Sequence, residues 1–183
     1  LIISTCYLLL TVVNKYHIHN EFKNTLTSQD IQYTEIKTVP LPLTNFLWMG
    51  IARMDDVYHV GYHSVFDKND TIHFSSFRRN ELLIIPLMKD KRVRNLVRFT
   101  KGYYAAVFDR GELIVNDLRF GRFGMDEDSP YIFAFRIRSD GKNIEVYEAD
   151  NSDAMTEEAF NLYIRRIFGD NQTVINDMDH LVH

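Results

Sequence analysis

The sequence contains a single cysteine, Cys6, so no disulfide can form within the chain. Cys6 lies in an apolar run, where a cysteine usually behaves as a small hydrophobic residue. An excess of positive charge is missing as well, because the formal net charge is −4 at pH 7. Nucleic acid is therefore not expected as a partner, since its phosphates are bound mainly through Lys and Arg. The composition leaves room for a small ligand.

The chain also lacks internal repeats, low-complexity linkers and long blocks of one charge. Its 183 residues match the size of one domain, and 45% of them are hydrophobic, which is enough to build a core. We therefore expect a single domain over residues 27–170, preceded by an N-terminal helix over residues 1–26. The polar residues 171–183 are expected to form a flexible tail.

No charged residue occurs from Leu1 to Val13. A helix of this length spans about 20 Å, whereas crossing a bilayer core takes about 20 residues. Two interpretations stay open. Either residues before Leu1 complete a transmembrane helix that ends here, or the segment is a buried amphipathic helix with Leu9, Val12 and Phe22 on its apolar stripe.

Three hairpins are predicted from alternating apolar residues that flank turn residues, over residues 45–66, 102–120 and 131–149. Their two-residue turns are expected at Asp55-Asp56, Arg110-Gly111 and Asp140-Gly141. In the third hairpin such a turn pairs Ser139 with Lys142, so that Arg136 faces Glu145 and Ile137 faces Ile144.

Helices are expected between the hairpins and at the end of the chain. Asn80 can cap one, Pro86 interrupts it and Gly102 can end it. A last helix is predicted from Met155 to Phe168. The expected fold is therefore α+β: an antiparallel sheet built from β-hairpins, with an N-terminal helix, inserted helices and a C-terminal helix.

The first hairpin gathers chemically active side chains on one face. Its register places Trp48 opposite His63 and Ala52 opposite His59, with Gly50 and Gly61 paired between them. Glycines inside strands mark close approach by a ligand, an aromatic ring or a backbone. The face is therefore either the wall of a ligand site, formed by Trp48, His59 and His63, or a surface covered by another element.

A metal site is an alternative use of these histidines. On a strand, His59 and His63 lie about 13 Å apart, which is too far to share one zinc ion comfortably. A self-contained, metal-assisted hydrolase would draw its ligands from His59, His63 or His73, with a carboxylate from Asp67 or Asp117. The sequence has no His-Glu-x-x-His motif and no paired cysteines to support it.

The second hairpin supplies a polar group. It places Tyr104 across from Asp117, with Arg119 next on the same face. A tyrosine, a carboxylate and a guanidinium together can bind an anion or a carbonyl compound, or they can form a buried polar network.

Several segments together carry a resemblance: the apolar helical start, "VPLPLTNFLWMGIA", "YHVGYHSVFD", "RRNELL", "KGYYAAV" and "NDLRFG". They resemble the soluble C-terminal region of the bacterial membrane-bound metal-dependent hydrolases, the YdjM-like proteins, from about Leu1 to Phe135. The resemblance implies that Leu1 to Val13 ends a transmembrane helix and that residues from about Asn14 onward face water. It also implies a divalent metal for the full-length protein. No catalytic residue carries over to this region.

The sequence thus supports one leading hypothesis and two alternatives. The leading one is a soluble accessory or ligand-recognition domain of a membrane-bound metal-dependent hydrolase, held at the bacterial inner membrane on a side that is not determined. The alternatives are the self-contained metal-assisted hydrolase and a structural or protein-interaction domain.

Overall fold

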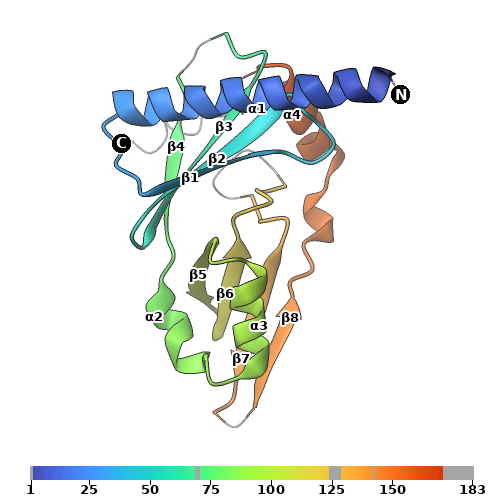
Figure 1. Ribbon diagram of the computed structural model, residues 1–183. Coiled ribbons are helices and arrows are strands. Elements are labelled where there is room, and N and C mark those ends of the chain that lie inside the picture. Colours follow the sequence, from blue (N-terminus) through green and yellow to red (C-terminus); the bar gives the residue numbers. More distant parts are fainter. Residues whose placement is uncertain (1, 69–70, 124–128, 142, 171–183) are drawn as a thin grey trace, which may run out of the picture.

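Two four-stranded antiparallel sheets lie one above the other in the computed structural model, with a long helix across the upper sheet (Figure 1). The structure describes residues 2–68, 71–123, 129–141 and 143–170. The upper sheet has the strand order β1-β2-β3-β4 and the lower sheet the order β5-β6-β7-β8. The eight strands are β1 (Glu35–Pro40), β2 (Leu47–Met54), β3 (Val57–Ser64), β4 (Phe74–Arg78), β5 (Tyr104–Asp109), β6 (Glu112–Asp117), β7 (Ala134–Ser139) and β8 (Ile144–Glu148). This arrangement confirms the predicted α+β class. The sequence did not predict β1 and β4 as strands.

The first two hairpins have the predicted registers. In the first, Gly50 pairs with Gly61 and Trp48 with His63, and the chain turns at Asp55 and Asp56. In the second, Asp109 pairs with Glu112 and Tyr104 with Asp117. A two-residue turn leaves one choice of register once the apolar face is known, so the pattern determined both pairings.

The third hairpin was predicted wrongly. Ser139 pairs with Ile144, two residues beyond Lys142, so that Arg138 and not Arg136 faces Glu145. The loop is longer because Asp140 and Asn143 close it themselves. The carboxylate of Asp140 accepts a hydrogen bond from the backbone N–H of Asn143 at 2.7 Å, and the backbone N–H of Asp140 donates to the carbonyl of Asn143.

Short helices connect the sheets: α2 (Glu81–Ile84), a 3₁₀ turn η1 (Ile85–Leu87) that contains Pro86, and α3 (Lys91–Phe99). Asn80 does not cap α2 with its side chain, contrary to expectation; its amide instead donates to the carbonyl of Ala106 at 2.8 Å. The true cap in this region is Asp90, whose carboxylate accepts from the backbone N–H of Arg92 at the start of α3.

The C-terminal helix α4 (Glu157–Ile167) follows the 3₁₀ turn η2 (Ser152–Ala154) and is slightly shorter than predicted. Thr156 caps it by accepting a hydrogen bond from the backbone N–H of Ala159 at 3.1 Å. Gly169 follows with a φ of 85°, the left-handed conformation that commonly ends a helix. The predicted flexible tail, residues 171–183, lies outside the described residues.

The N-terminal helix α1 (Ile2–Ser28) fits the predicted buried stripe only in part, because Phe22 is buried but Leu9 and Val12 are exposed. In its C-terminal half, Ile18, Phe22 and Leu26 are fully buried against the upper sheet. In its N-terminal half, Leu9, Val12 and their neighbours are exposed. Among the described residues, no helix is long and apolar enough to cross a membrane.

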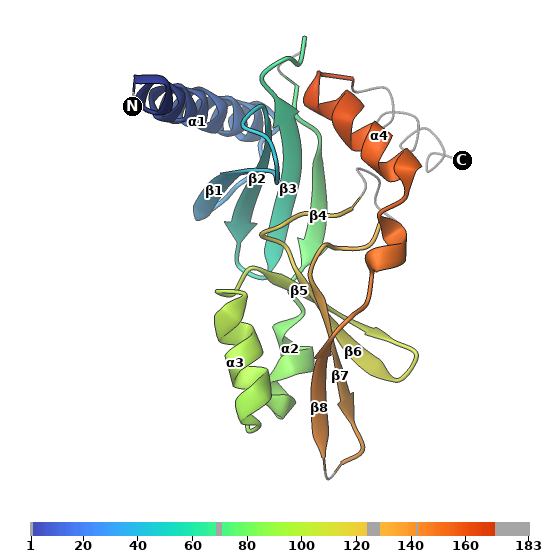
Figure 2. The ribbon, with the colours of Figure 1, turned by 90° about the vertical axis from the view of Figure 1, so that its right-hand side faces the viewer.

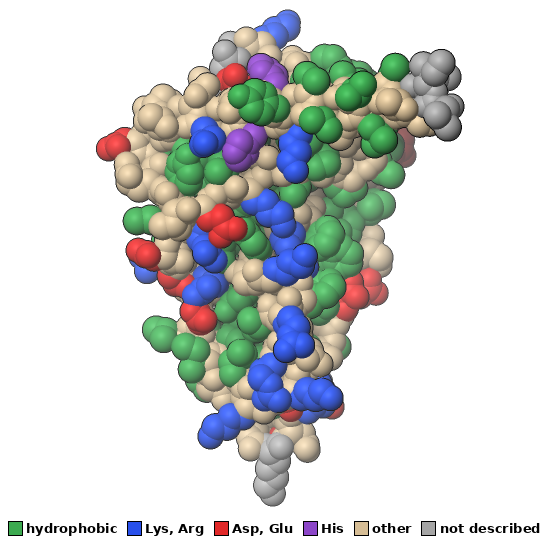
Figure 3. Space-filling view, viewed as in Figure 1, with side chains coloured by type: hydrophobic (Ala, Val, Ile, Leu, Met, Phe, Trp, Pro, Cys, Tyr) green, Lys and Arg blue, Asp and Glu red, His purple; other side chains and the backbone are tan. Residues whose placement is uncertain are grey.

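One core cluster joins the two sheets. It contains Leu41, Leu47, Met49, Ile51, Tyr58, Val60, Tyr103, Ala105, Leu118, Tyr131 and Ile167. Strands of both sheets and the end of α4 therefore share this core. Figure 2 shows α4 and α1 lying along opposite sides of the upper sheet. A band of Lys and Arg side chains runs down the face that carries α1, from below the middle of this helix to α3 (Figure 3).

Candidate functional site

The face of the first hairpin that carries Trp48, His59 and His63 is covered by α1. A Cβ atom placed on Gly50 would lie 2.3 Å from Cδ1 of Phe22, so the Phe22 ring occupies the space above this glycine. On Gly61 a Cβ would lie 2.8 Å from Ile72 Cγ2. Trp48 is buried on the same face and donates its indole N–H to the carbonyl of Asn45. The bare glycines therefore accommodate packing side chains from α1 and from the segment before β4.

A buried ionic cluster lies at the end of β3. Nδ1 of His63 lies 3.1 Å from Oδ2 of Asp67, and the Arg166 guanidinium donates to both oxygens of Asp67 at 2.6 and 2.8 Å. Arg166 also donates to the carbonyl of Tyr62 at 3.2 Å. The three side chains of this His63–Asp67–Arg166 cluster are each 5% exposed or less. It connects the turn after β3 to the last turn of α4.

The charge of Asp67 is stabilised by its neighbours. Burial alone would raise the pKa of this carboxyl group, but hydrogen bonds from His63, Arg166 and the backbone N–H of Ser64 outweigh that effect and lower the pKa to about 2. Asp67 is therefore a carboxylate at neutral pH. Its lone pairs are used by three neighbouring residues, which suits a structural ion pair better than a general base.

Ser64 lies beside this cluster, so the three residue types of a serine–histidine–aspartate triad are present here. Its geometry is not that of a nucleophile. The Ser64 hydroxyl is fully buried and donates to the backbone carbonyl of Ile167, while it accepts from the N–H of Phe66 at 3.2 Å. Both the proton and a lone pair of this hydroxyl hold the chain in place, so Ser64 helps to tie the turn after β3 to α4.

Of the candidate metal ligands, the structure shows one pair in contact, His63 and Asp67. Nδ1 of His59 lies 2.9 Å from the Ser76 hydroxyl, and burial lowers the pKa of this histidine. His73 is exposed in the segment before β4, whereas His63 belongs to the buried cluster. Across the described ranges, no group of three or more His, Cys, Asp and Glu side chains could hold a metal ion.

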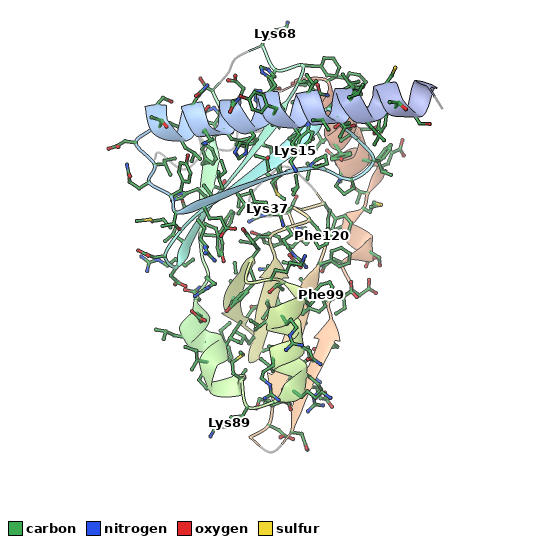
Figure 4. The ribbon with its side chains drawn as sticks, in the orientation of Figure 1. Lys15, Lys37, Lys68, Lys89, Phe99 and Phe120 are labelled. Carbon is green, nitrogen blue, oxygen red and sulfur yellow. The ribbon has the colours of Figure 1, made fainter. Side chains whose placement is uncertain are left out.

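Of the polar group predicted in the second hairpin, Tyr104, Asp117 and Arg119, the structure brings two members into direct contact. The Arg119 guanidinium donates to both Asp117 oxygens, at 2.9 and 2.6 Å, and the Arg119 backbone N–H donates to Asp117 at 3.0 Å. The guanidinium also lies 5.0 Å from the centre of the Phe99 ring, and Figure 4 labels Phe99 beside Phe120 at this junction of the two sheets. Asp117 itself is fully buried.

Tyr104, the third member, packs its ring in the core of the lower sheet, and the Arg79 guanidinium lies 5.9 Å from the ring centre. Burial raises the pKa of the Tyr104 hydroxyl to about 12. The Asp117–Arg119 pair and Tyr104 thus brace the start of the β5–β6 hairpin.

The N-terminal half of α1 exposes a group of large apolar side chains. From the sequence, this segment could be the end of a transmembrane helix or part of a buried amphipathic helix. These residues are Tyr7, Leu8, Leu9, Leu10, Val12, Val13 and Tyr16, each between 47% and 73% exposed. Figure 3 shows apolar side chains along α1 toward its N-terminus. Contiguous exposed apolar surface of this kind marks contact with a partner or a membrane.

A second apolar feature lies between α4 and the loop that follows β1. A cavity of about 130 Å³ is lined by Leu41, Pro42, Leu43, Arg122, Phe123, Ile132, Met155, Ala159, Phe160 and Tyr163. The Tyr163 hydroxyl donates to the carbonyl of Pro42 and joins its two walls. Sequence analysis did not find this cavity, because its two walls are more than 100 residues apart in the chain.

Comparisons with known proteins add nothing to this description: no family model, no curated protein and no solved structure matches the chain.

Proposed function

We propose that this chain is a water-facing accessory domain of a membrane-bound protein, attached to the bilayer through the N-terminal half of α1. The observation that carries the proposal is the exposed apolar segment from Tyr7 to Val13, which contains no charged residue. Burying one such side chain in an apolar environment contributes about 1.5–3 kcal/mol. A lipid bilayer offers that environment to all sides of a helix at once.

The exposure is distributed around α1 in a way that fits lipid better than a protein groove. Residues Ser4 to Leu10 are all exposed, so no single face of this half of the helix is reserved for one partner. After Asn14 the pattern changes: Ile18, Phe22 and Leu26 are buried against the sheet and polar residues face outward. An amphipathic groove-binding helix would keep one polar face throughout.

The family resemblance of the sequence extends the proposal. The membrane-bound protein would be a metal-dependent hydrolase of the bacterial inner membrane, with its catalytic centre and divalent metal outside this chain. An accessory role is supported by the state of the candidate side chains here, because Asp67 and Asp117 are each held by an arginine and Ser64 is buried.

Sedimentation with vesicles of phosphatidylcholine and phosphatidylglycerol tests the attachment. The double variant Leu9→Ser, Val12→Ser should lower the bound fraction by at least about tenfold, because each substitution removes more than 1 kcal/mol of transfer free energy. The matched control is Leu82→Ser, Val107→Ser, which changes exposed residues of the same types outside α1. Equal binding by both double variants would contradict the proposal.

A further inference from the structure

Three phenylalanines from three separate segments form an exposed row. The ring centroids of Phe46 and Phe66 are 5.2 Å apart, and those of Phe66 and Phe168 are 5.8 Å apart. Their exposed fractions are 38%, 45% and 66%. Phe46 precedes β2, Phe66 follows β3 and Phe168 follows α4, so the fold brings together residues that are more than 100 positions apart. We refer to Phe46, Phe66 and Phe168 as the aromatic row.

The aromatic row is held in its exposed position by the surrounding backbone. A Cβ on Gly169 would lie 2.4 Å from the carbonyl oxygen of Phe66, so the two segments are already in close contact. The backbone N–H of Val65 donates to the carbonyl of Phe46 at 2.8 Å. Beneath the row, Arg166 fixes the end of α4 to Asp67. These contacts fix the backbone positions from which the three rings project.

The row adjoins the exposed apolar segment of α1. The side-chain amide of Asn45, next to Phe46, donates to the Thr11 hydroxyl at 3.1 Å. The side-chain amide of Asn14 donates in turn to the carbonyl of Asn45 at 3.3 Å. The aromatic row thus begins beside the turn of α1 at which its exposed apolar half ends.

We infer that the aromatic row is a second membrane contact, which rests on the headgroup region of the bilayer that α1 enters. This inference rests on the proposed attachment and adds the face of the domain that meets lipid. Trp and Tyr are enriched at membrane–water interfaces, and Phe side chains of interfacial segments bury at the boundary of headgroups and acyl chains. Each ring of the row projects from a different loop or helix end.

Charge around the row favours anionic lipid. Lys68 directly follows the Phe66 turn and is exposed; Figure 4 shows it beyond α1 at the upper edge of the molecule. Arg165 is exposed on the last turn of α4, three residues before Phe168. Basic side chains near an anionic bilayer surface each strengthen binding.

The experiment installs a fluorescent ring in the row. Phe66→Trp and Phe168→Trp each add one indole to the single buried Trp48 of the chain. With vesicles that contain brominated lipid, the added indole should shift its emission to shorter wavelength and lose about half of its intensity or more. Phe108→Trp is the matched control, because Phe108 is 64% exposed at the far end of the lower sheet. Its emission should not change.

A second measurement uses the loss of the rings. The variant Phe66→Ser, Phe168→Ser should weaken vesicle binding by about tenfold or more, whereas Phe108→Ser should leave it unchanged. Quenching absent at position 66, in a chain that still binds vesicles through α1, would overturn the inference and leave the proposed attachment standing. Failure of the unaltered chain to bind vesicles would overturn both. A concentration-dependent emission shift without vesicles would assign the row to contact between copies of the chain and overturn the lipid inference.

Discussion

Arg166, in the last turn of α4, donates two hydrogen bonds of 2.6 and 2.8 Å to Asp67, a residue 99 positions earlier in the chain. The pair is buried, and it is the point at which the C-terminal helix is locked to the end of β3. Much of the architecture that presents the aromatic row depends on this contact.

Removing one partner should therefore be costly. We expect Arg166→Ala to lower the free energy of unfolding by about 3–5 kcal/mol, because a buried carboxylate is left without its counter-charge. Urea denaturation measures the change. The neighbouring exposed residue gives the control: Arg165→Ala should stay within about 0.5 kcal/mol of the unaltered chain. Similar losses for both variants would contradict a special role of the buried pair.

The same pair predicts a pH dependence. The pKa of Asp67 is lowered from its ordinary value of 3.8 to about 2, so the folded state favours the carboxylate. Its contribution of about 2 kcal/mol is complete above about pH 5 and is lost as the pH falls toward 2. Urea midpoints for the unaltered chain and Asp67→Asn should therefore converge as the pH is lowered from about 5 to about 3. Parallel curves would show that Asp67 does not titrate as described.

Contact between Phe22 and Gly50 gives a third prediction. Gly50→Ala places a methyl group where the Phe22 ring lies, so either α1 or the ring must shift. Overpacking of this kind destabilises by about 1–3 kcal/mol. The companion variant Gly50→Ala, Phe22→Leu should recover part of the loss, as measured by thermal unfolding. An unchanged midpoint for Gly50→Ala would mean that α1 does not cover this glycine.

Metal analysis provides a fourth prediction. The purified chain should contain no stoichiometric transition metal, because His63 and Asp67 are engaged with each other and with a cationic Arg166. His59→Ala and His63→Ala should leave the metal content unchanged. One equivalent of metal per chain, lost in either variant, would revive the alternative of a self-contained metal-assisted hydrolase.

Some of this structure could be predicted from local patterns and some could not. Alternation and two-residue turns specified the Gly50–Gly61 and Tyr104–Asp117 pairings. The register of the third hairpin was predicted wrongly because Asp140 and Asn143 form a longer loop around the same Asp-Gly dipeptide. The loop type depends on a side-chain hydrogen bond, which the alternation of apolar and polar residues does not indicate.

In the candidate site, too, only some of the contacts could be predicted from local sequence patterns. His63 and Asp67 were both candidate metal ligands, and the two do meet, although in a buried pair across the turn after β3. Arg166, which completes their cluster, lies on α4 and has no local signal that connects it to Asp67. The aromatic row was missed for a similar reason, because Phe46, Phe66 and Phe168 become neighbours only in the folded chain.

Cys6 allows a direct measurement of the bilayer attachment. It is the only cysteine, it is exposed, and it lies in the apolar half of α1. With a water-soluble maleimide, vesicles should slow its labelling by about tenfold or more, since lipid would exclude both water and reagent. In a Cys6→Ser, Thr27→Cys variant, the thiol at the exposed polar end of the same helix should label at the same rate with and without vesicles. Labelling of Cys6 at an undiminished rate in the presence of vesicles would contradict attachment through α1.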